Sequence, residues 1–174
     1  MRLNVSRELK MPGSAAKAHF TERWEDIDCP TGDVRFASPV TVDAEYAFDG
    51  EGFSITGIIC TVFNSICSRC GKEFIEDFRT QFDERFQKSA SEDDEGEIYL
   101  FTGEEIILDD LVRDQILLMK PVYSLCREDC RGLCPVCGCD LNTVQCSCIA
   151  YGDADEPDNP FAKLKALLKD DKEV

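Results

Sequence analysis

Eleven cysteines in a chain of 174 residues constrain this protein more than any other feature. Seven of them lie between Cys126 and Cys148. In a small secreted protein such a density indicates disulfides, but here the number is odd and the spacings are short. Thiols clustered in this way in a reducing compartment are typical of metal ligands. The sequence therefore predicts a metal-binding protein.

The rest of the sequence favours the reducing compartment. The first ten residues, MRLNVSRELK, carry positive charge but no apolar stretch follows them, so they do not resemble a secretory signal. No apolar run approaches the roughly 20 residues that a membrane-spanning helix needs. We therefore expect a cytoplasmic protein with no membrane partner.

Two short motifs carry the metal prediction. Cys67-Ser-Arg-Cys70-Gly71 and Cys134-Pro-Val-Cys137-Gly138 each present two thiols from a tight turn, with glycine where the backbone folds back. Backbone N–H groups in such turns donate to the sulfurs. Zinc takes four such ligands in tetrahedral geometry, so each motif supplies half a site.

The remaining cysteines complete the sites in more than one way. The economical partition binds two zinc ions, and its alternative is a single site that uses Cys126, Cys130, Cys134 and Cys137. We expect one or two zinc ions per chain. In the two-ion partition the first site is Cys67, Cys70, Cys126 and Cys130, and the second is Cys134, Cys137, Cys146 and Cys148.

Two other kinds of chemistry use cysteine motifs. A thioredoxin-type redox pair requires a βαβ setting that the sequence does not indicate, whereas an iron–sulfur cluster is compatible with the crowding after Cys126. Closed sites of four cysteines stabilise folds and leave no open position for a substrate. Because the sequence also lacks a Walker loop, a dinucleotide-binding turn and a nucleophile elbow, we expect no enzymatic activity and no small-molecule substrate.

Strand patterns dominate the first two thirds of the chain. Residues 40–48 alternate apolar and polar, Asp49-Gly50 supplies turn residues, and 53–63 is rich in β-branched and aromatic residues, which predicts a hairpin. Residues 74–86 place phenylalanine at every fourth position, a spacing that fits a strand or a helix. We favour a strand, because a tight turn at Cys67–Cys70 returns the chain antiparallel.

A helix is expected after a short strand near 98–101. Asp109 and Asp110 are expected to cap it, and Pro121 ends it. The predicted fold class is α+β, an antiparallel β meander core with one packed helix, a cysteine-rich zinc knuckle and a C-terminal amphipathic helix. The buried stripe of the first helix is expected to be Leu108, Val112, Ile116 and Met119.

Three segments follow from this pattern. They are a sheet domain with its helix (1–121), a cysteine-rich zinc-binding segment (122–151), and a linker with a short amphipathic helix (152–174).

The formal charge of −16 is concentrated in acidic blocks, of which 91–119 holds ten acidic residues and one arginine. Such blocks keep RNA off a surface or attract a basic partner.

Several stretches together resemble the YceD family of bacteria and plastids. The resemblance implies a large ribosomal RNA subunit accumulation protein without catalytic residues, and the extended cysteine string resembles the members of Gram-positive bacteria. The stretches that carry it are the Cys67–Cys70 motif, the segment Leu108-Asp-Asp-Leu-Val-Arg-Asp-Gln-Ile-Leu-Leu118 with Pro121, the cysteine string from Leu125 to Cys148, and the tail Asn159-Pro-Phe-Ala162 with Leu164 and Leu167.

The resulting hypothesis is a non-enzymatic zinc-binding factor that supports accumulation or assembly of large-subunit ribosomal RNA. It would bind the rRNA precursor or a basic large-subunit ribosomal protein. An alternative is an acidic protein–protein module that holds the ribosomal protein without touching RNA, and a redox or cluster-bearing enzyme is the third candidate. If RNA is bound, the candidate residues are Arg69, Lys72, Arg127 and Arg131 near the two turns.

Overall fold

The computed structural model describes residues 1–29, 32–88 and 98–148. Within these ranges the chain forms mostly β-strands with one α-helix, in a first unit, Met1–Glu128, and a second that begins at Asp129. The elements, all in the first unit, are β1 (Arg2–Asn4), a 3₁₀ turn (Glu8–Lys10), β2 (Ala15–Glu22), β3 (Val40–Phe48), β4 (Gly52–Ile66), β5 (Glu73–Gln87), β6 (Tyr99–Leu100), β7 (Glu105–Ile107) and α1 (Asp109–Met119).

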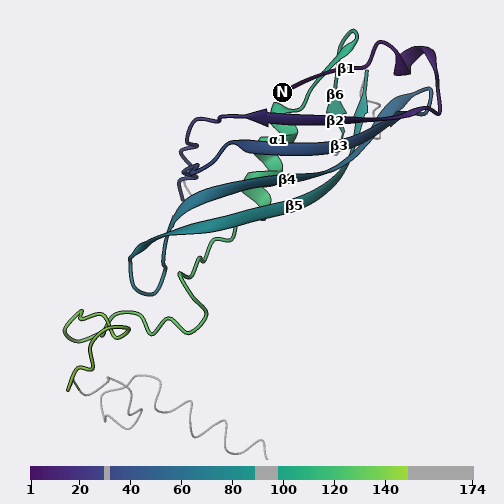
Figure 1. Ribbon diagram of the computed structural model, residues 1–174. Helices are drawn as coiled ribbons and strands as arrows, with labels where there is room; N and C mark the ends of the chain where they lie inside the picture. The colour runs from purple at the N-terminus through teal and green to yellow at the C-terminus, as the bar shows by residue number, and fades with distance from the viewer. Residues whose placement is uncertain (30–31, 89–97, 149–174) are drawn as a thin grey trace, which may run out of the picture. The chain divides into compact units, whose positions relative to one another are not determined.

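The main sheet is a meander, as expected. Strands β2, β3, β4 and β5 lie side by side in chain order, each antiparallel to the next, and the short β6 joins β5 in parallel (Figure 1). The longest pairing runs between β4 and β5, from Gly52 opposite Gln87 to Ile66 opposite Glu73. This pairing brings the Cys67–Cys70 turn to one end of the sheet.

The phenylalanine-rich segment is a strand, which confirms the prediction. Phe78, Phe82 and Phe86 are buried, while Arg79 and Asp83 between them are exposed. A spacing of four along a strand selects every second residue of one face, because successive side chains alternate between faces. The strand assignment therefore explains the burial of all three rings.

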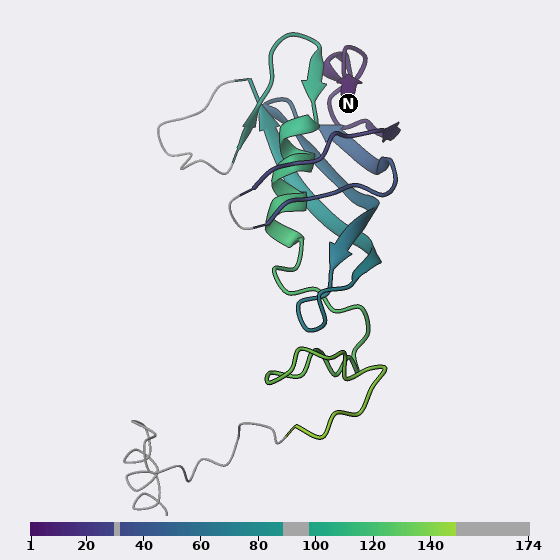
Figure 2. The same cartoon turned by 90° about the vertical axis from the view of Figure 1, so that its left-hand side faces the viewer.

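Helix α1 covers one face of the sheet (Figure 2). Leu108, Val112 and Ile116 are fully buried, as predicted, and Leu111 is buried with them. Met119 is 57% exposed, so its place in the buried stripe was predicted wrongly. The buried stripe includes Leu111 because residues three or four positions apart, such as Leu108 and Leu111, lie on the same helix face.

The start of α1 also differs from the prediction. Its N-cap residue is Leu108, which provides no side-chain cap, whereas Asp109 and Asp110 occupy the first turn. Asp109 accepts a hydrogen bond of 2.6 Å from the amino group of Met1. Acidic residues in a first turn still interact favourably with the positive end of the helix dipole.

Strands β1 and β2 were not predicted from the sequence. The segment Ala15–Glu22 alternates inward and outward, but its inward positions include Ala16 and Ala18, which give little hydrophobic contrast. β1 pairs with β7 over three residues, too few to show an alternation of apolar and polar residues.

The predicted C-terminal helix lies outside the described residues, and the segment boundaries at 121 and 151 remain predictions. No helix within the described ranges is long and apolar enough to span a membrane.

The β3–β4 turn depends on one carboxylate. Asp49 Oδ1 accepts hydrogen bonds from the backbone N–H groups of Glu51 and Gly52, each at 2.9 Å, and Oδ2 lies 2.7 Å from Arg85. The amides of Gly52 and Glu51, and then Arg85, lower the pKa of Asp49 to about 2. Because the folded-state pKa is depressed, this carboxylate stabilises the fold above pH 4 and ceases to do so as the pH falls toward 2.

We therefore expect Asp49→Asn to reduce the free energy of unfolding at pH 7 by about 1 kcal/mol or less, since the carboxylate is half exposed. The difference from the native chain should shrink as the pH falls from 4 to 2. Urea unfolding of both proteins at each pH measures it. The matched control is Glu51→Gln in the same turn, and a difference for Asp49→Asn that stays constant with pH would contradict this role of the carboxylate.

Candidate metal centre

The first cysteine turn joins β4 to β5. The N–H of Gly71 donates to the carbonyl of Cys67 at 2.9 Å, and the N–H of Cys67 donates to the carbonyl of Lys72 at 2.8 Å. Gly71 has a φ of 70°, a conformation that side chains disfavour. The turn therefore points both of its thiols to the same side.

A distant segment brings further thiols to this turn. The Sγ atoms of Cys70 and Cys126 are 3.8 Å apart, although 56 residues separate them in the chain. The thiols of Cys67, Cys70 and Cys126, all in the first unit, lie within 4.8 Å of one another. Cys130, the predicted fourth ligand, belongs to the second unit, and its role stays a prediction. With metal–sulfur bonds of about 2.3 Å, the edge of a tetrahedral site is roughly 3.8 Å, so this spacing fits a bound ion.

The Cys67 sulfur sits among backbone donors. The backbone N–H of Cys126, and then those of Cys70 and Arg69, donate to it and lower the pKa of the thiol to about 6. Because the thiolate is the form that binds metals, this environment prepares the sulfur as a ligand. The donation within the turn is the arrangement that its sequence predicted.

Buried polar contacts hold the Cys126 segment beside the sheet. The N–H of Ser68 donates to the carbonyl of Ser124 at 2.9 Å. Glu76 Oε2 accepts hydrogen bonds from the hydroxyls of Ser65, at 2.6 Å, and Ser124, at 2.8 Å. Both serines are buried, so these bonds link β4, β5 and the segment after α1. No motif or spacing in the sequence indicates this link.

The second turn repeats the geometry of the first. The N–H of Gly138 donates to the carbonyl of Cys134, and the N–H of Cys134 donates to the carbonyl of Cys139, both at 2.8 Å. Gly138 has a φ of 72°. Backbone N–H groups of Cys137 and Val136 lower the pKa of Cys134 to about 6. The shared backbone pattern indicates a shared ligand role.

The thiols around this turn include one that the sequence left without a role. Cys134, Cys137, Cys139 and Cys146 have their Sγ atoms within 4.8 Å of one another. Cys148, the predicted fourth ligand, makes side-chain contacts with Cys137 and Cys134. The assignment of Cys148 as a ligand stays a prediction, and Cys139 joins it as a candidate.

An asparagine supports the nearby Cys130. Asn142 Nδ2 lies 3.5 Å from Cys130 Sγ, and Asn142 Oδ1 accepts a hydrogen bond of 2.8 Å from the N–H of Arg131. Partners that orient a ligand tune its metal affinity. Both cysteine groups offer only sulfur donors, a set that suits soft or borderline metal ions.

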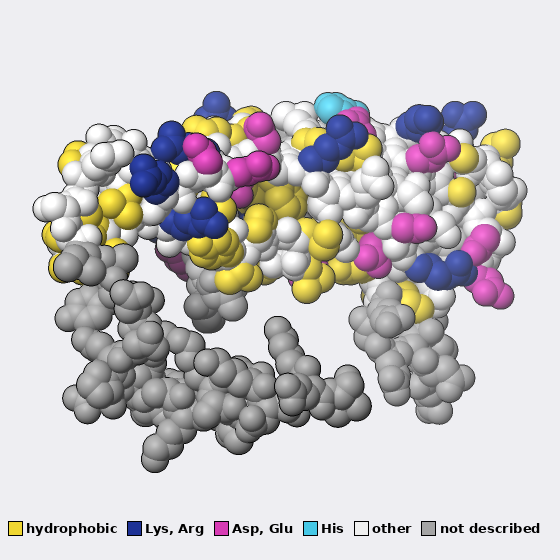
Figure 3. Space-filling model, turned by 90° about the horizontal axis from the view of Figure 1, so that it is seen from below, with side chains coloured by type: hydrophobic (Ala, Val, Ile, Leu, Met, Phe, Trp, Pro, Cys, Tyr) yellow, Lys and Arg dark blue, Asp and Glu magenta, His cyan; other side chains and the backbone are white. Residues whose placement is uncertain are grey.

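The basic candidates are exposed near these turns. Arg69 donates from Nε to the Tyr123 hydroxyl and from a terminal nitrogen to the carbonyl of Glu128, each at 3.3 Å. Lys72 and Arg127 are exposed in the first unit, and Arg131 is exposed in the second. In Figure 3, acidic and basic side chains are interspersed and form no continuous basic surface on the face shown.

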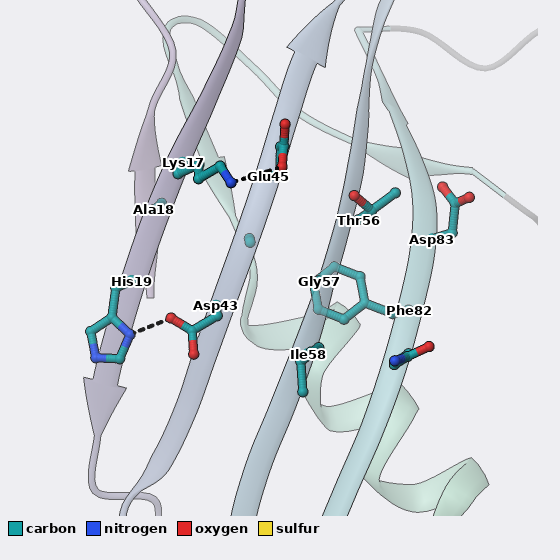
Figure 4. Close-up of a pocket in the computed structure, with 12 residues that line it drawn as sticks. Lys17, Ala18, His19, Asp43, Glu45, Thr56, Gly57, Ile58, Phe82 and Asp83 are labelled. Carbon is teal, nitrogen blue, oxygen red and sulfur yellow. Dashed lines mark hydrogen bonds and ion pairs between the residues drawn. The ribbon is translucent and has the colours of Figure 1, made fainter.

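A shallow hollow lies on the face of the sheet away from α1 (Figure 4). Its charged side chains pair across β2 and β3. Lys17 Nζ lies 3.3 Å from Glu45, and His19 Nδ1 lies 2.6 Å from Asp43. These groups are mostly exposed, so the hollow has the character of a solvated strand face.

Comparisons with known proteins connect this architecture to a family. The family model described as large ribosomal RNA subunit accumulation protein YceD matches residues 55–168, a span that includes both cysteine groups. Uncharacterized proteins of Mycobacterium bovis and Mycobacterium tuberculosis are 32% identical to the chain over 146 residues, which cover 81% of this chain and 70% of theirs. No solved structure matches the chain. The chain therefore belongs to the YceD family, whose name ties it to large-subunit ribosomal RNA.

Proposed function

We propose that this protein is a cytoplasmic, non-enzymatic zinc-binding factor that supports accumulation or assembly of large-subunit ribosomal RNA. The family match over residues 55–168 carries the proposal. Sites with four sulfur ligands stabilise folds and leave no open coordination position for catalysis. The proposed role is therefore to bind rRNA or a ribosomal protein through a surface whose conformation the metal sites stabilise.

Zinc is the proposed ion, with one or two per chain. The spacing of the first thiol group fits a tetrahedral ion, and both turns direct backbone N–H groups at a sulfur. Zinc has no redox chemistry of its own and tolerates all-cysteine sites. Metal analysis of the purified protein tests this proposal, and a coloured iron-containing protein would contradict it.

The proposed RNA contact is centred on the first turn. Lys72 directly follows the turn, Arg127 follows Cys126, and both are exposed. Arg69 donates a hydrogen bond to the hydroxyl of Tyr123, a residue that is 56% exposed. An exposed aromatic ring beside a guanidinium is a surface on which an unpaired base stacks, with phosphates held by the neighbouring cations. Arg131, in the second unit, is the fourth candidate cation.

The alternative is that acidic side chains hold a basic ribosomal protein. A specific observation favours it. Asp110 and Asp114 are exposed on α1, and Asp114 accepts a hydrogen bond of 3.0 Å from the hydroxyl of Tyr99, so two negative charges lie close together on this side of the helix. This negative potential at the exposed side of α1 attracts a basic partner and repels RNA.

Depletion of the protein tests the proposed function. We expect the amount of large-subunit rRNA to fall relative to small-subunit rRNA, because the factor supports only the large subunit. Quantification of the two rRNAs before and after depletion measures this, with re-expression of the native chain as the control. An unchanged ratio would overturn the proposal.

Crosslinking in cells separates the two modes of action. If RNA is bound at the first turn, Lys72→Gln combined with Arg127→Gln should reduce recovery of crosslinked rRNA several-fold. Lys17→Gln in β2, on the sheet face away from α1, should not reduce it. If the acidic surface is used, Asp110→Asn with Asp114→Asn should reduce recovery of a ribosomal protein, and rRNA would be absent from the native sample. The Asp→Asn substitutions keep the size of the side chain, whereas the Lys→Gln and Arg→Gln substitutions remove the charge and leave a shorter polar side chain.

A further inference from the structure

The solvent-facing side of α1 changes character along the helix. Asp110, Arg113 and Asp114 are exposed in its first half. Leu117 and Leu118 are exposed in its last turn, Leu118 by 76%. These positions are three or four residues apart, so they share one face of the helix. Because the outer face of a surface helix is ordinarily polar, two neighbouring exposed leucines depart from the usual pattern.

The apolar surface extends beyond the two leucines. Leu117 lines a hollow together with Ile66, at the end of β4, and Val122, which follows the helix. Both Ile66 and Val122 are exposed. Exposed apolar side chains that gather in one place on a protein mark a site where another molecule binds.

Acidic hollows lie on both sides of the leucine pair. The segment after β2 lies beside α1 and forms one hollow with Leu117 (Figure 2). Residues of β5 and β6 form the other hollow with Leu118. The charged side chains of the first hollow are Glu25, Asp26, Asp28 and Arg113, and those of the second are Asp83, Glu84, Asp114 and Arg85. Each leucine is therefore bordered by three carboxylates and one arginine.

The charge of these hollows restricts what the leucines can bind. An RNA strand, an anionic membrane and a second copy of this chain, with its formal charge of −16, are all repelled. An apolar stripe between two acidic borders is complementary to an apolar stripe between two basic borders. Helices pair in this way in coiled coils, where charged side chains flank the apolar seam. The complementary segment is thus a basic amphipathic helix.

We propose that Leu117 and Leu118, with the acidic hollows beside them, form a docking surface for a basic amphipathic helix of another protein, a proposal that rests on the protein-binding alternative given above. The apolar stripe of that helix packs on the two leucines, and its lysines and arginines lie over the carboxylates of both hollows. Trp24, the single tryptophan of the chain, lines the first hollow. Binding therefore changes its fluorescence.

A synthetic peptide tests this surface on the full-length chain. The probe contains only leucine and lysine, with the leucines three and four positions apart, as on one face of a helix. A peptide of the same composition without that spacing is the control. Fluorescence of Trp24 and anisotropy of the labelled peptide measure the dissociation constant. We expect the native chain to bind the probe several-fold more tightly than the control peptide.

A leucine variant tests the apolar contribution. Leu118→Ser should weaken binding of the probe several-fold, because it removes an apolar contact without changing the charge. The matched control is Ile75→Ser, which removes a 63% exposed apolar side chain from β5. It should leave the dissociation constant unchanged. Far-ultraviolet circular dichroism checks that both variants are folded, as expected for substitutions of such exposed side chains.

A charge variant tests the acidic borders. Asp28→Asn combined with Asp114→Asn removes one charge from each hollow, and should weaken binding several-fold at low salt and reduce its salt dependence. The matched control is Asp43→Asn combined with Glu45→Gln, which removes the same charge from the sheet face away from α1. It should have a much smaller effect.

Three results would overturn the docking surface. They are equal affinity of the native chain and Leu118→Ser for the probe, equal effects of the two charge variants, and binding that appears only when Leu164 and Leu168 of the predicted C-terminal helix are replaced by serine. The last would assign the surface to the chain's own tail. An unchanged rRNA ratio on depletion would instead overturn the proposed function and leave the peptide binding as it is, so the two failures are distinct.

Discussion

Replacement of Cys70 by serine is expected to destabilise the whole first unit when zinc is present, by several kcal/mol in the free energy of unfolding. Binding of a structural zinc contributes on the order of 10 kcal/mol of apparent free energy that appears as folding energy. Cys70 lies in the turn between β4 and β5, and its partner Cys126 lies beyond α1. Loss of the ion would therefore release a link between the sheet and the segment after the helix.

The matched control is Cys60→Ser, because Cys60 lies half-buried in β4 and outside both thiol groups. It should change stability far less than Cys70→Ser. Cys146→Ser should loosen the second unit and leave unfolding of the sheet unchanged. Thermal unfolding followed by far-ultraviolet circular dichroism measures these effects. Equal global destabilisation by Cys70→Ser and Cys146→Ser would contradict two separate sites.

Truncation of Phe63 to alanine should destabilise the first unit by about 3–5 kcal/mol, the range for a large ring removed from a packed core. Phe63 is fully buried in β4, with its ring 5.1 Å from that of Phe78 and 5.6 Å from that of Phe36. The ammonium group of Lys120 lies 5.8 Å from the ring centre. The ring therefore joins β4, β5, the segment before β3 and the end of α1.

Phe63→Leu is the control, since it keeps most of the apolar volume and should cost less than half as much as alanine. Denaturant unfolding of the three proteins in saturating zinc compares them. The zinc content should not change, because Phe63 is not a ligand. A cost below about 1 kcal/mol for alanine would show that the ring is not part of a packed core.

Much of the fold could be predicted from local pattern. The hairpin of β3 and β4, the long β5 and the single helix follow from alternation, turn residues and a helical stripe, because their buried faces are rich in large apolar side chains. Strand β2 was missed because alanine carries little of this contrast. The capping role of Asp109 was predicted wrongly, because the helix begins at Asp109 itself, and its contact with the amino group of Met1, 108 residues away in sequence, leaves no local pattern.

The sequence predicted the ligands of the candidate metal centre better than the contacts that position them. The two Cys-x-x-Cys-Gly turns have the backbone geometry that their sequence indicates. The two-ion partition paired Cys126 with Cys70 by counting ligands, whereas the contacts of Glu76 with two serines, which hold the Cys126 segment beside the sheet, follow from no spacing. Cys139 was missed because adjacent motifs offered enough ligands without it.

The separation of the ligands along the chain also governs when each site can form during synthesis. Cys126 is made 56 residues after Cys70, which at about 5–20 residues per second corresponds to roughly 3–11 s. During that interval the first turn holds two thiols without their distant partners. All the thiols of the second group lie between 134 and 148, so that group can bind an ion soon after its own synthesis. The first site links the sheet to the segment after α1. Because its distant thiols are made late, it can bind zinc with all of its ligands only after most of the chain has been made.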